Sequence, residues 1–353
     1  MNCCMTTKQR AKRVFVLIAL LLSVLSGQLY AKNYYFSSVS GNDSYTTTQA
    51  QVSTTPWKTI TKLNSFMASL VSGDSILFKR GETFVGAINV TKAGLIFASY
   101  GTGADLPTIS GLQDITSWTS VGTNLWRSTA LSNITDLNVL LVNNNFVPYG
   151  KYPNTGFMKF EAHTGTNIIT DNELTATPNF VGAELVLRLR GHELNRHPIT
   201  AHSGTSLTFT GNTISINDGY GYIIQKSLAT LDQQNEWFFD KTTKQITIYS
   251  TSAPTGVKAS IVDNLFTVSG YNSIKIRNLN FIGANKLAIN LVNSSSDFIE
   301  NCNISFSGES AIFGSTVTNL TATGNNIYYS NNNGIDLDNT NNSNCFIRNN
   351  SIR

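Results

Sequence analysis

The chain has 353 residues, of which 13% are charged, and it carries 25 Lys and Arg against 21 Asp and Glu. Four of these basic residues and no acidic residue lie within residues 1–31, so the remainder has 21 residues of each charge and is formally neutral. This balance gives no support to a nucleic acid or an anionic surface as the partner.

Residues 1–31 have the pattern of a secretory signal peptide. A basic start from Lys8 to Arg13 precedes an apolar run over residues 14–25, and Ala31 is a small residue suited to cleavage. The apolar run is shorter than the roughly 20 residues of a membrane span. We therefore expect cleavage after Ala31 and a secreted or cell-surface protein without a membrane span; an uncleaved anchor is the alternative.

Residues 32–130 are expected to form an N-terminal cap followed by the first β-strands. Thr55 and Pro56 suit the cap and the first position of a helix, and Gly73 would end it. Its apolar residues fall on one face: Ile60, Leu63, Met67 and Leu70. Such a helix would cover strand edges that otherwise recruit other chains.

Residues 131–255 carry irregular strand and turn patterns and are predicted to be an inserted β-rich subdomain. Tyr220, Tyr222 and Trp237 are candidates for stacking against a sugar, although packing in a core is the default for Trp237. Glu236 and Asp240 are more readily explained as turn caps than as catalytic acids.

A group of polar residues within this segment resembles a metal cluster: His192, Glu193, His197 and His202. A spacing of five residues alternates faces on a strand, and no HExxH motif is present. No metal site is therefore predicted here, and His192 is kept as a candidate polar contact to a substrate.

Residues 256–353 are predicted to form further coils, and from Asn264 to Arg353 they repeat themselves at intervals of 23 residues, with one step of 25. The apolar columns are Phe266, Ile289, Ile312, Ile335; Leu265, Ala288, Ala311, Gly334; and Phe281, Ile304, Ile327, Ile352. The polar columns are Asn280, Asn303, Asn326, Ser351; and Asn278, Asn301, Gly324, Asn349. Self-similarity at a fixed period indicates a stacked-repeat architecture.

Each repeat is too short for a helix pair and offers short strands separated by turn formers. A coil of this length predicts a parallel β-helix, in which equivalent residues stack roughly 4.8 Å apart. Aligned asparagines would then bond from coil to coil. A β-sandwich with coincidental spacing is the alternative. Cys302 and Cys345 fall in different columns, so both are expected to be apolar fillers rather than a disulfide.

Several segments resemble secreted right-handed parallel β-helix proteins of polysaccharide-degrading bacteria, within the pectate-lyase-like superfamily. The N-terminal matches are Gly41-Asn-Asp43, Pro56-Trp-Lys-Thr-Ile60, Gly73 to Gly81 and Pro107-Thr-Ile-Ser-Gly111. The Leu231-Asp232, Glu236-Trp-Phe and Ile248-Tyr249 series is similar to β-helical glycoside hydrolases of the xylosidase and fucosidase type, with Gln234-Asn235 departing from their pattern.

The resemblance implies the pectin lyase fold, a polysaccharide or oligosaccharide partner, and hydrolysis in preference to lyase chemistry. A non-catalytic glycan-binding or adhesion protein on the same scaffold is the alternative. Because the chain ends inside a repeat at Arg353, we also expect part of the active site to lie in residues that follow.

Paired carboxylates are the residues that glycoside hydrolysis needs, about 5–5.5 Å apart in retaining enzymes and about 6.5–9.5 Å apart in inverting ones. No acid in the repeats has a second acid one coil away; Asp297 aligns with Leu320, and Glu309 with Asn332. Arg277 aligns with Glu300 and Lys286 with Glu309, which predicts two surface salt bridges.

The remaining acidic pair is Asp336 and Asp338, two residues apart on one strand and hence about 6.6 Å from each other. They are the candidate catalytic pair, and they would also suit a shared calcium ion. A solvated turn entry in this Asn- and Asp-rich segment is the favoured interpretation. For a lyase, Lys275, Arg277 and Arg348 are candidate bases, and the spacing selects none of them.

Overall fold

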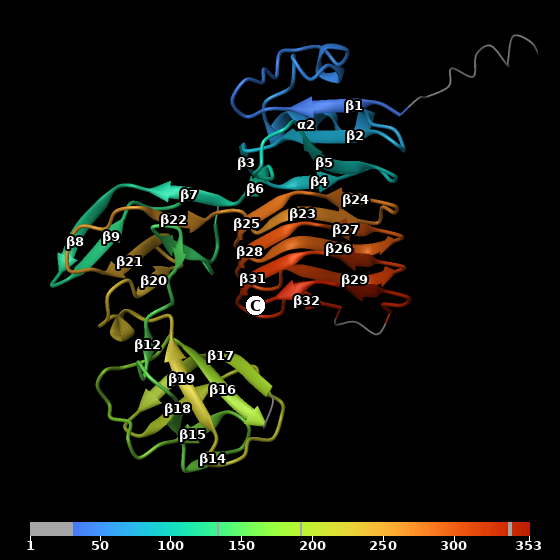
Figure 1. Ribbon diagram of the computed structural model, residues 1–353. Coiled ribbons are helices and arrows are strands. Elements are labelled where there is room, and N and C mark those ends of the chain that lie inside the picture. Colours follow the sequence, from blue (N-terminus) through green and yellow to red (C-terminus); the bar gives the residue numbers. More distant parts are fainter. Residues whose placement is uncertain (1–30, 133, 191–192, 338–340) are drawn as a thin grey trace, which may run out of the picture.

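The computed structural model describes residues 31–353 except 133, 191–192 and 338–340. It consists of a parallel β-solenoid, which carries the N-terminal and C-terminal parts of the chain, and two antiparallel inserts that project from one flank (Figure 1). The segment predicted as a signal peptide lies outside the described residues, apart from Ala31.

Three parallel sheets form the solenoid, and each gains one strand per coil. Sheet A consists of β1 (Asn33–Phe36), β2 (Ser75–Lys79), β5 (Ile96–Tyr100), β24 (Lys275–Arg277), β27 (Phe298–Glu300), β30 (Thr321–Thr323) and β33 (Phe346–Arg348). Sheet B consists of β3 (Thr83–Val85), β6 (Thr108–Ser110), β25 (Asn280–Ala284), β28 (Asn303–Ser307), β31 (Asn326–Ser330) and β34 (Ser351–Ile352). Sheet C consists of β4 (Ile88–Val90), β23 (Asn264–Ser269), β26 (Leu287–Ser295), β29 (Ile312–Thr318) and β32 (Ile335–Asp336).

The predicted columns are confirmed as vertical neighbours inside the solenoid. Phe266 pairs with Ile289, Ile289 with Ile312, and Ile312 with Ile335. The first three of these side chains are fully buried. The prediction of a parallel β-helix with coils of about 23 residues is therefore correct, and the apolar columns form its core.

The two polar columns also have physical roles. The amide of Asn303 donates to Asn280 Oδ1 at 2.8 Å, and the amide of Asn326 donates to Asn303 Oδ1 at 3.0 Å. The other column forms the left-handed corner between sheets A and B, where φ is 53° at Asn301 and 68° at Gly324. A Cβ at Gly324 would lie 2.4 Å from Asn301 Oδ1, so a side chain at that level would require the Asn301 amide to move.

The N-terminal cap contains the predicted apolar face but begins later than predicted. Its helix α2 spans Ile60–Phe66 and continues as the 3₁₀ turn η2 (Met67–Ser69), with Thr59 as the capping residue. The segment at Pro56 is extended, because Trp57 exchanges backbone hydrogen bonds with Tyr35 and Ser37. A further 3₁₀ turn, η1 (Gln49–Gln51), belongs to the same cap.

The first insert consists of two antiparallel four-stranded sheets beside sheet B. One contains β11 (Asn145–Phe146), β10 (Leu140–Val142), β22 (Val257–Ser260) and β7 (Leu112–Ile115); the other contains β20 (Trp237–Asp240), β21 (Gln245–Tyr249), β9 (Leu125–Ser128) and β8 (Trp118–Gly122). The antiparallel strands thus begin at Leu112, ahead of the expected residue 131. The solenoid closes across the insertion, because Ile109 of β6 pairs directly with Phe281 of β25.

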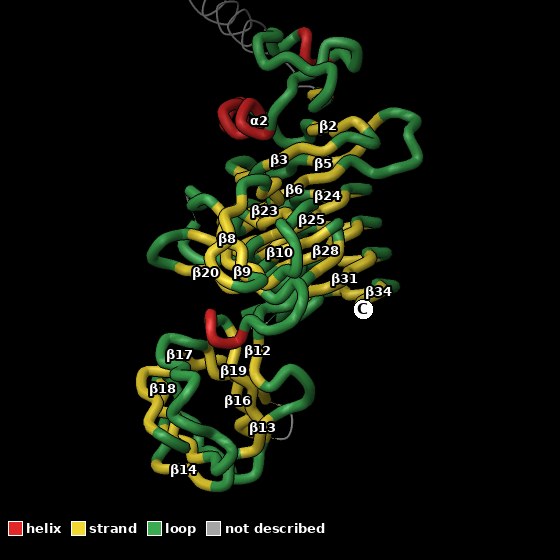
Figure 2. Tube along the Cα trace, turned by 90° about the vertical axis from the view of Figure 1, so that its left-hand side faces the viewer, coloured by secondary structure: helices red, strands yellow, loops and turns green. Residues whose placement is uncertain are grey.

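The second insert hangs from the first as a separate lobe (Figure 2). Its sheet contains β12 (Lys151–Tyr152), β19 (Gly221–Gln225), β16 (Glu184–Arg190), β17 (Glu193–Ser203), β18 (Ser206–Phe209), β15 (Ile168–Thr170) and β14 (Ala162–Thr164), with β13 (Met158–Lys159) paired to β19. The 3₁₀ turn η3 (Leu228–Thr230) leads back to the first insert. Each insert has its own hydrophobic core, so neither depends on the solenoid core for burial.

Candidate functional site

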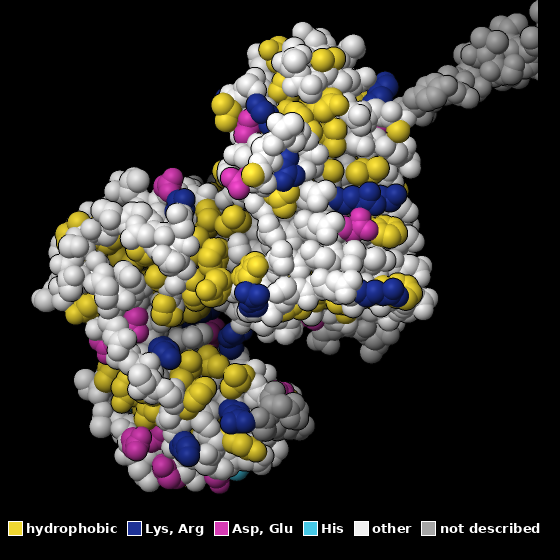
Figure 3. Space-filling model, viewed as in Figure 1, with side chains coloured by type: hydrophobic (Ala, Val, Ile, Leu, Met, Phe, Trp, Pro, Cys, Tyr) yellow, Lys and Arg dark blue, Asp and Glu magenta, His cyan; other side chains and the backbone are white. Residues whose placement is uncertain are grey.

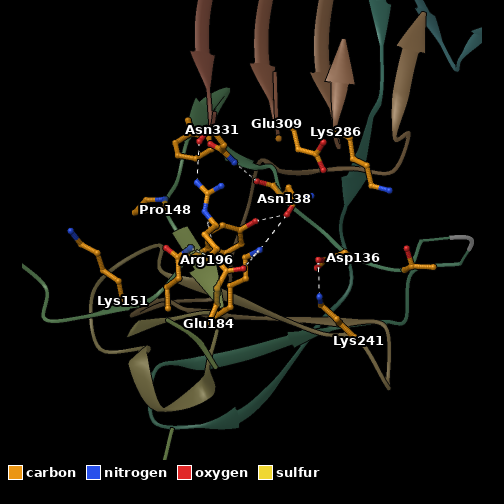
Figure 4. A pocket seen from close by; sticks show the side chains of 16 residues that line it. Asp136, Asn138, Pro148, Lys151, Glu184, Arg196, Lys241, Lys286, Glu309 and Asn331 are labelled. Carbon is orange, nitrogen blue, oxygen red and sulfur yellow. Dashed lines mark hydrogen bonds and ion pairs between the residues drawn. The ribbon is translucent and has the colours of Figure 1, made fainter. Parts of the chain in front are cut away.

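A cavity of about 670 Å³ lies where the solenoid and both inserts meet, and we call it the junction cleft. The surface is hollowed at this place (Figure 3), and Figure 4 shows the side chains around it. Its charged lining residues are Asp136, Lys151, Glu184, Arg196, Lys226, Lys241, Lys286 and Glu309. They come from three separate parts of the chain, so the cleft exists only in the folded arrangement.

The solenoid wall of the cleft is formed by the turns that follow the strands of sheet B. Lys286 follows β25 and Glu309 follows β28, one coil later. Lys286 Nζ lies 2.8 Å from Asp263 Oδ2, and this hydrogen bond raises the pKa of Lys286. The predicted pairing of Lys286 with Glu309 is therefore wrong, because Asp263 lies closer. Within the described residues, the Glu309 carboxylate makes no ion pair and no side-chain hydrogen bond.

The second insert supplies the opposite wall through two neighbouring strands. Glu184 of β16 accepts a hydrogen bond of 2.6 Å from Gln225 and forms an ion pair of 3.3 Å with Lys226. Arg196 of β17 donates to the backbone oxygen of Asn331 at 3.1 Å, which ties this wall to the solenoid. Gln225, Lys226 and Arg196, which lies 3.9 Å from Glu184, thus hold the Glu184 carboxylate in one orientation in the cleft.

Asn138 and Tyr149 of the first insert form a third wall of the cleft, and hydrogen bonds hold both side chains in place. Asn138 donates two hydrogen bonds to Asn285 of the solenoid, from its backbone and its side-chain amide, and the Tyr149 hydroxyl donates to Asn138 Oδ1 at 3.0 Å. Burial raises the pKa of Tyr149 well above its usual value. Lys226 Nζ lies 4.7 Å from the centre of the Tyr149 ring, in a cation–π contact.

The third carboxylate of the cleft is Asp136, which pairs with Lys241 at 2.7 Å. The acids therefore differ in their surroundings: Asp136 and Glu184 are paired with lysines, whereas Glu309 is exposed and unpaired among the described residues. A site with fixed and unengaged carboxylates in one open cavity has the residue types that acid–base chemistry requires.

Two of the three aromatic candidates lie in hydrophobic cores. Tyr222 is fully buried, and its hydroxyl donates to Asp171 Oδ2 at 2.7 Å. Trp237 is also fully buried, and its indole donates to the Val147 oxygen at 2.9 Å. Neither ring has a face left for a sugar, so the stacking interpretation fails for both. Tyr220 is half-buried beside Arg188 and lines a different surface cavity.

The predicted acidic pair is not part of the junction cleft. Asp336 is half-buried in β32 of sheet C and accepts hydrogen bonds from Ser310 and Asn333, both at 3.1 Å. Asp338 lies outside the described residues, and so does His192. The catalytic interpretation of this pair therefore stays a prediction.

The structural roles predicted for Glu236, Asp240 and the Arg277–Glu300 pair are confirmed. Glu236 accepts from the backbone amides of Asp232 and Gln233, and Asp240 accepts from those of Thr242 and Thr243, so both cap turns. The predicted Arg277–Glu300 salt bridge is present at 2.6 Å.

His197 and His202 make their contacts within the second insert itself. His197 is buried against Phe209, and its Nδ1 lies 3.2 Å from the Thr210 oxygen. His202 Nδ1 accepts a hydrogen bond from the amide of Phe180. In the part of the chain that the structure describes, no group of three or more His, Cys, Asp or Glu side chains could hold a metal ion.

The sequence did not identify Glu184 as a site residue, and it identified Glu309 only as a salt-bridge partner. Glu184 and Glu309 are 125 positions apart, and the 23-residue register that relates the coils does not extend into the inserts. The signal that was present is the position of Glu309 in a turn directly after a strand of sheet B, one coil after Lys286.

Several solved structures are similar to this chain over part of their own length. A protein described as a glycoside hydrolase matches over 84% of this chain and 67% of its own, with a TM-score of 0.67 and 13% identity. XylC, solved with xylose, matches over 90% of this chain and 53% of its own, with a TM-score of 0.46 and 13% identity. A GH136 lacto-N-biosidase from Eubacterium ramulus covers 94% of this chain and 42% of its own, with a TM-score of 0.37 and 11% identity. The chain thus spans about half the length of the last two.

No protein-family model and no curated protein matches the sequence. Among the described residues, none of the helices is long and apolar enough to cross a membrane. At these identities the structural likeness establishes the fold alone: the chain is a β-solenoid with antiparallel inserts, similar in architecture to a glycoside hydrolase.

Proposed function

We propose that this protein is a secreted glycan-processing enzyme that hydrolyses glycosidic bonds in the junction cleft. The observation that carries the proposal is the convergence of Asp136, Glu184 and Glu309, from three distant segments, on one open polar cavity. Its volume lies within the roughly 300–1,000 Å³ range of small-molecule sites. The architecture shared with a glycoside hydrolase supports the same choice.

Glu184 and Glu309 are the proposed pair. Hydrolysis of a glycosidic bond needs one carboxyl group to protonate the leaving oxygen and a second to attack or to activate water. Gln225 and Lys226 hold Glu184 in a fixed orientation, which suits the second role. Glu309 has no side-chain partner among the described residues and is free to meet the leaving oxygen.

The test is reducing-sugar release from a panel of neutral and acidic plant and algal polysaccharides, with Glu184→Gln and Glu309→Gln compared with the wild type. Each variant is expected to lose about 10²–10⁴-fold in rate, the usual contribution of general acid–base catalysis. Glu300→Gln is the matched control, because Glu300 pairs with Arg277 on sheet A, away from the cleft.

Two outcomes would contradict this assignment. Full activity in both cleft variants would show that Glu184 and Glu309 take no part in the reaction. Loss of activity in the double variant Asp336→Asn, Asp338→Asn would assign catalysis to that pair instead. Products with unsaturated uronate ends would identify a lyase.

A non-catalytic glycan-binding protein is the second candidate. The observation that favours it is the pairing of Asp136 and Glu184 with lysines, which leaves one unpaired carboxylate among the three described in the cleft. Tight binding of a glycan without product release, and equal binding by the two Gln variants, would support this candidate.

A further inference from the structure

A second cavity, of about 360 Å³, lies between the outer face of sheet B and the first insert, and we call it the flank groove. Thr83 of β3 and Thr108 and Ser110 of β6 line its solenoid side. Asp114 of β7 and Lys258 of β22 line its insert side. The groove is distinct from the junction cleft, with which it shares none of its lining residues.

Phe306 lies in the groove with an unusual backbone conformation. Its φ is 59°, and Tyr329, one coil later, has φ 54°. Bulky residues rarely adopt positive φ, and such strain persists only where the surroundings enforce it. The equivalent residue one coil earlier is Gly283, whose φ is 72° and where a Cβ would lie 2.4 Å from Leu112.

Tyr329 stacks on the Phe306 ring from the side of the later coils, with ring centroids 5.3 Å apart and planes 10° apart. On the side of the earlier coils the Leu112 side chain lies over Gly283, and Phe306 lines the groove together with Leu112 and Ile282. The groove therefore has an apolar floor that includes an aromatic ring.

The polar walls of the groove are neutral as a whole. Asp114 and Lys258 are direct cross-strand neighbours of β7 and β22, one of each charge. Lys258 Nζ donates to Asn144 Oδ1 at 3.0 Å. The solenoid side adds hydroxyl groups, which both donate and accept. Hydroxyl-rich walls without net charge around an aromatic ring match a neutral sugar, whose faces are apolar and whose edges carry hydroxyls.

We propose that the flank groove is a binding subsite for a neutral sugar unit, with Phe306 as its stacking platform. This inference rests on the proposed function in one respect, that the ligand is a glycan. Phe306 and Glu309 lie three residues apart around the same turn, and Asn144 and Phe146 of one hairpin line the groove and the cleft respectively. A glycan chain whose scissile bond lies in the cleft would extend its further units into the groove.

The experiment measures binding by the full chain, independently of hydrolysis. The probes are immobilised neutral oligosaccharides from xylan, mannan, glucan and galactan, and acidic ones from alginate and polygalacturonate, followed by calorimetry with the best binder. Phe306→Gly removes the ring and relieves the positive φ, so it is expected to weaken binding about tenfold without lowering Tm. Thr83→Trp, which fills the exposed end of the groove, should weaken binding to the same neutral probe.

The controls separate this subsite from the cleft. Phe346→Gly removes another exposed ring, on sheet A, and is expected to leave binding unchanged. Glu309→Gln should lose hydrolysis and keep binding; if it keeps hydrolysis instead, the proposed catalytic pair is wrong while the groove still stands. The groove assignment is overturned if the wild type binds none of the neutral probes, or if Phe306→Gly and Thr83→Trp both bind them as tightly as the wild type.

Discussion

The solenoid and the second insert bury their side chains in different ways. In the solenoid, Ile289 contacts Ile312 and Ile304 contacts Ile327, so each partner lies 23 residues away. In the second insert, Leu185 pairs with His197 across one hairpin, whereas Met158 pairs with Tyr222 across most of the lobe. A constant separation leaves visible columns in the sequence, while antiparallel pairs of varying separation leave none.

This difference has an energetic consequence. Equivalent positions in successive coils have nearly the same surroundings, so equivalent substitutions in the solenoid should have similar costs, as expected when stability is a sum of repeat and neighbour terms. Positions in the inserts have no such equivalents.

Removing a core side chain should give the largest effect. Ile289→Ala and Ile312→Ala are each expected to lower the free energy of unfolding by about 2–5 kcal/mol, because both residues are fully buried. Urea unfolding followed by circular dichroism measures the cost. For the two isoleucine variants, backbone amides of the adjacent coils should exchange their hydrogens faster. For Leu187→Ala, faster exchange is expected in the second insert only. Costs that differ widely between Ile289 and Ile312 would break the equivalence of the coils.

Asp297 is the exception within an apolar column, between Ile274 and Leu320. It is 1% exposed, and burial raises its pKa from 3.8 to about 6, although the Ile274 amide donates to it at 2.9 Å. The folded state therefore binds the proton more tightly than the unfolded chain. Stability should fall as pH rises from about 4 to about 6 and stay lower above that window.

Asp297→Asn tests this directly, because the amide oxygen can still accept from Ile274. The variant is expected to gain on the order of 1–3 kcal/mol at pH 8 and to lose the pH dependence between about 4 and 6. Unfolding curves across that range measure both quantities, with the exposed Asp114→Asn as control. Wild-type stability that rises with pH through this window would contradict the assignment.

The asparagine ladder should contribute less than the core. Asn303→Ala removes its bonds to Asn280 and Asn326, so a loss of about 1–2 kcal/mol is expected. Asn332→Ala, on an exposed turn, is the matched control. If both variants unfold at the same urea concentration as the wild type, the hydrogen bonds between the asparagines add no stability and are only a result of the stacking of the coils.

The surface ion pair should contribute least. Arg277→Ala is expected to cost less than about 1 kcal/mol, because the Arg277 side chain is 40% exposed and water and salt screen the pair. A double-mutant cycle with Glu300→Ala isolates the pair, and added salt should shrink the coupling. A large coupling that resists salt would show that this pair behaves like a buried one.

The sequence predicted the features that the repeat determines and missed those that depend on long-range packing. The columns through Ile312 and Asn303 were predicted because one period relates every member. The helix start was missed because Trp57 pairs with β1 as extended chain, which overrides the capping signal of Thr55 and Pro56. Neither Glu184 nor the burial of Tyr222 could be predicted, because both depend on how the inserts fold.

Gly308 determines how the first insert is attached to the solenoid. A Cβ at this position would lie 2.6 Å from Asn138 Cβ of the first insert and 2.0 Å from the backbone oxygen of Asn285 in the previous coil, so the solenoid backbone lies directly against the Asn138 side chain. The separation of the cleft walls is consequently not adjustable at this point by exchanging side chains. A change in the size of the ligand that the cleft accepts would therefore come from substitutions at other lining residues, such as Lys151 or Arg196.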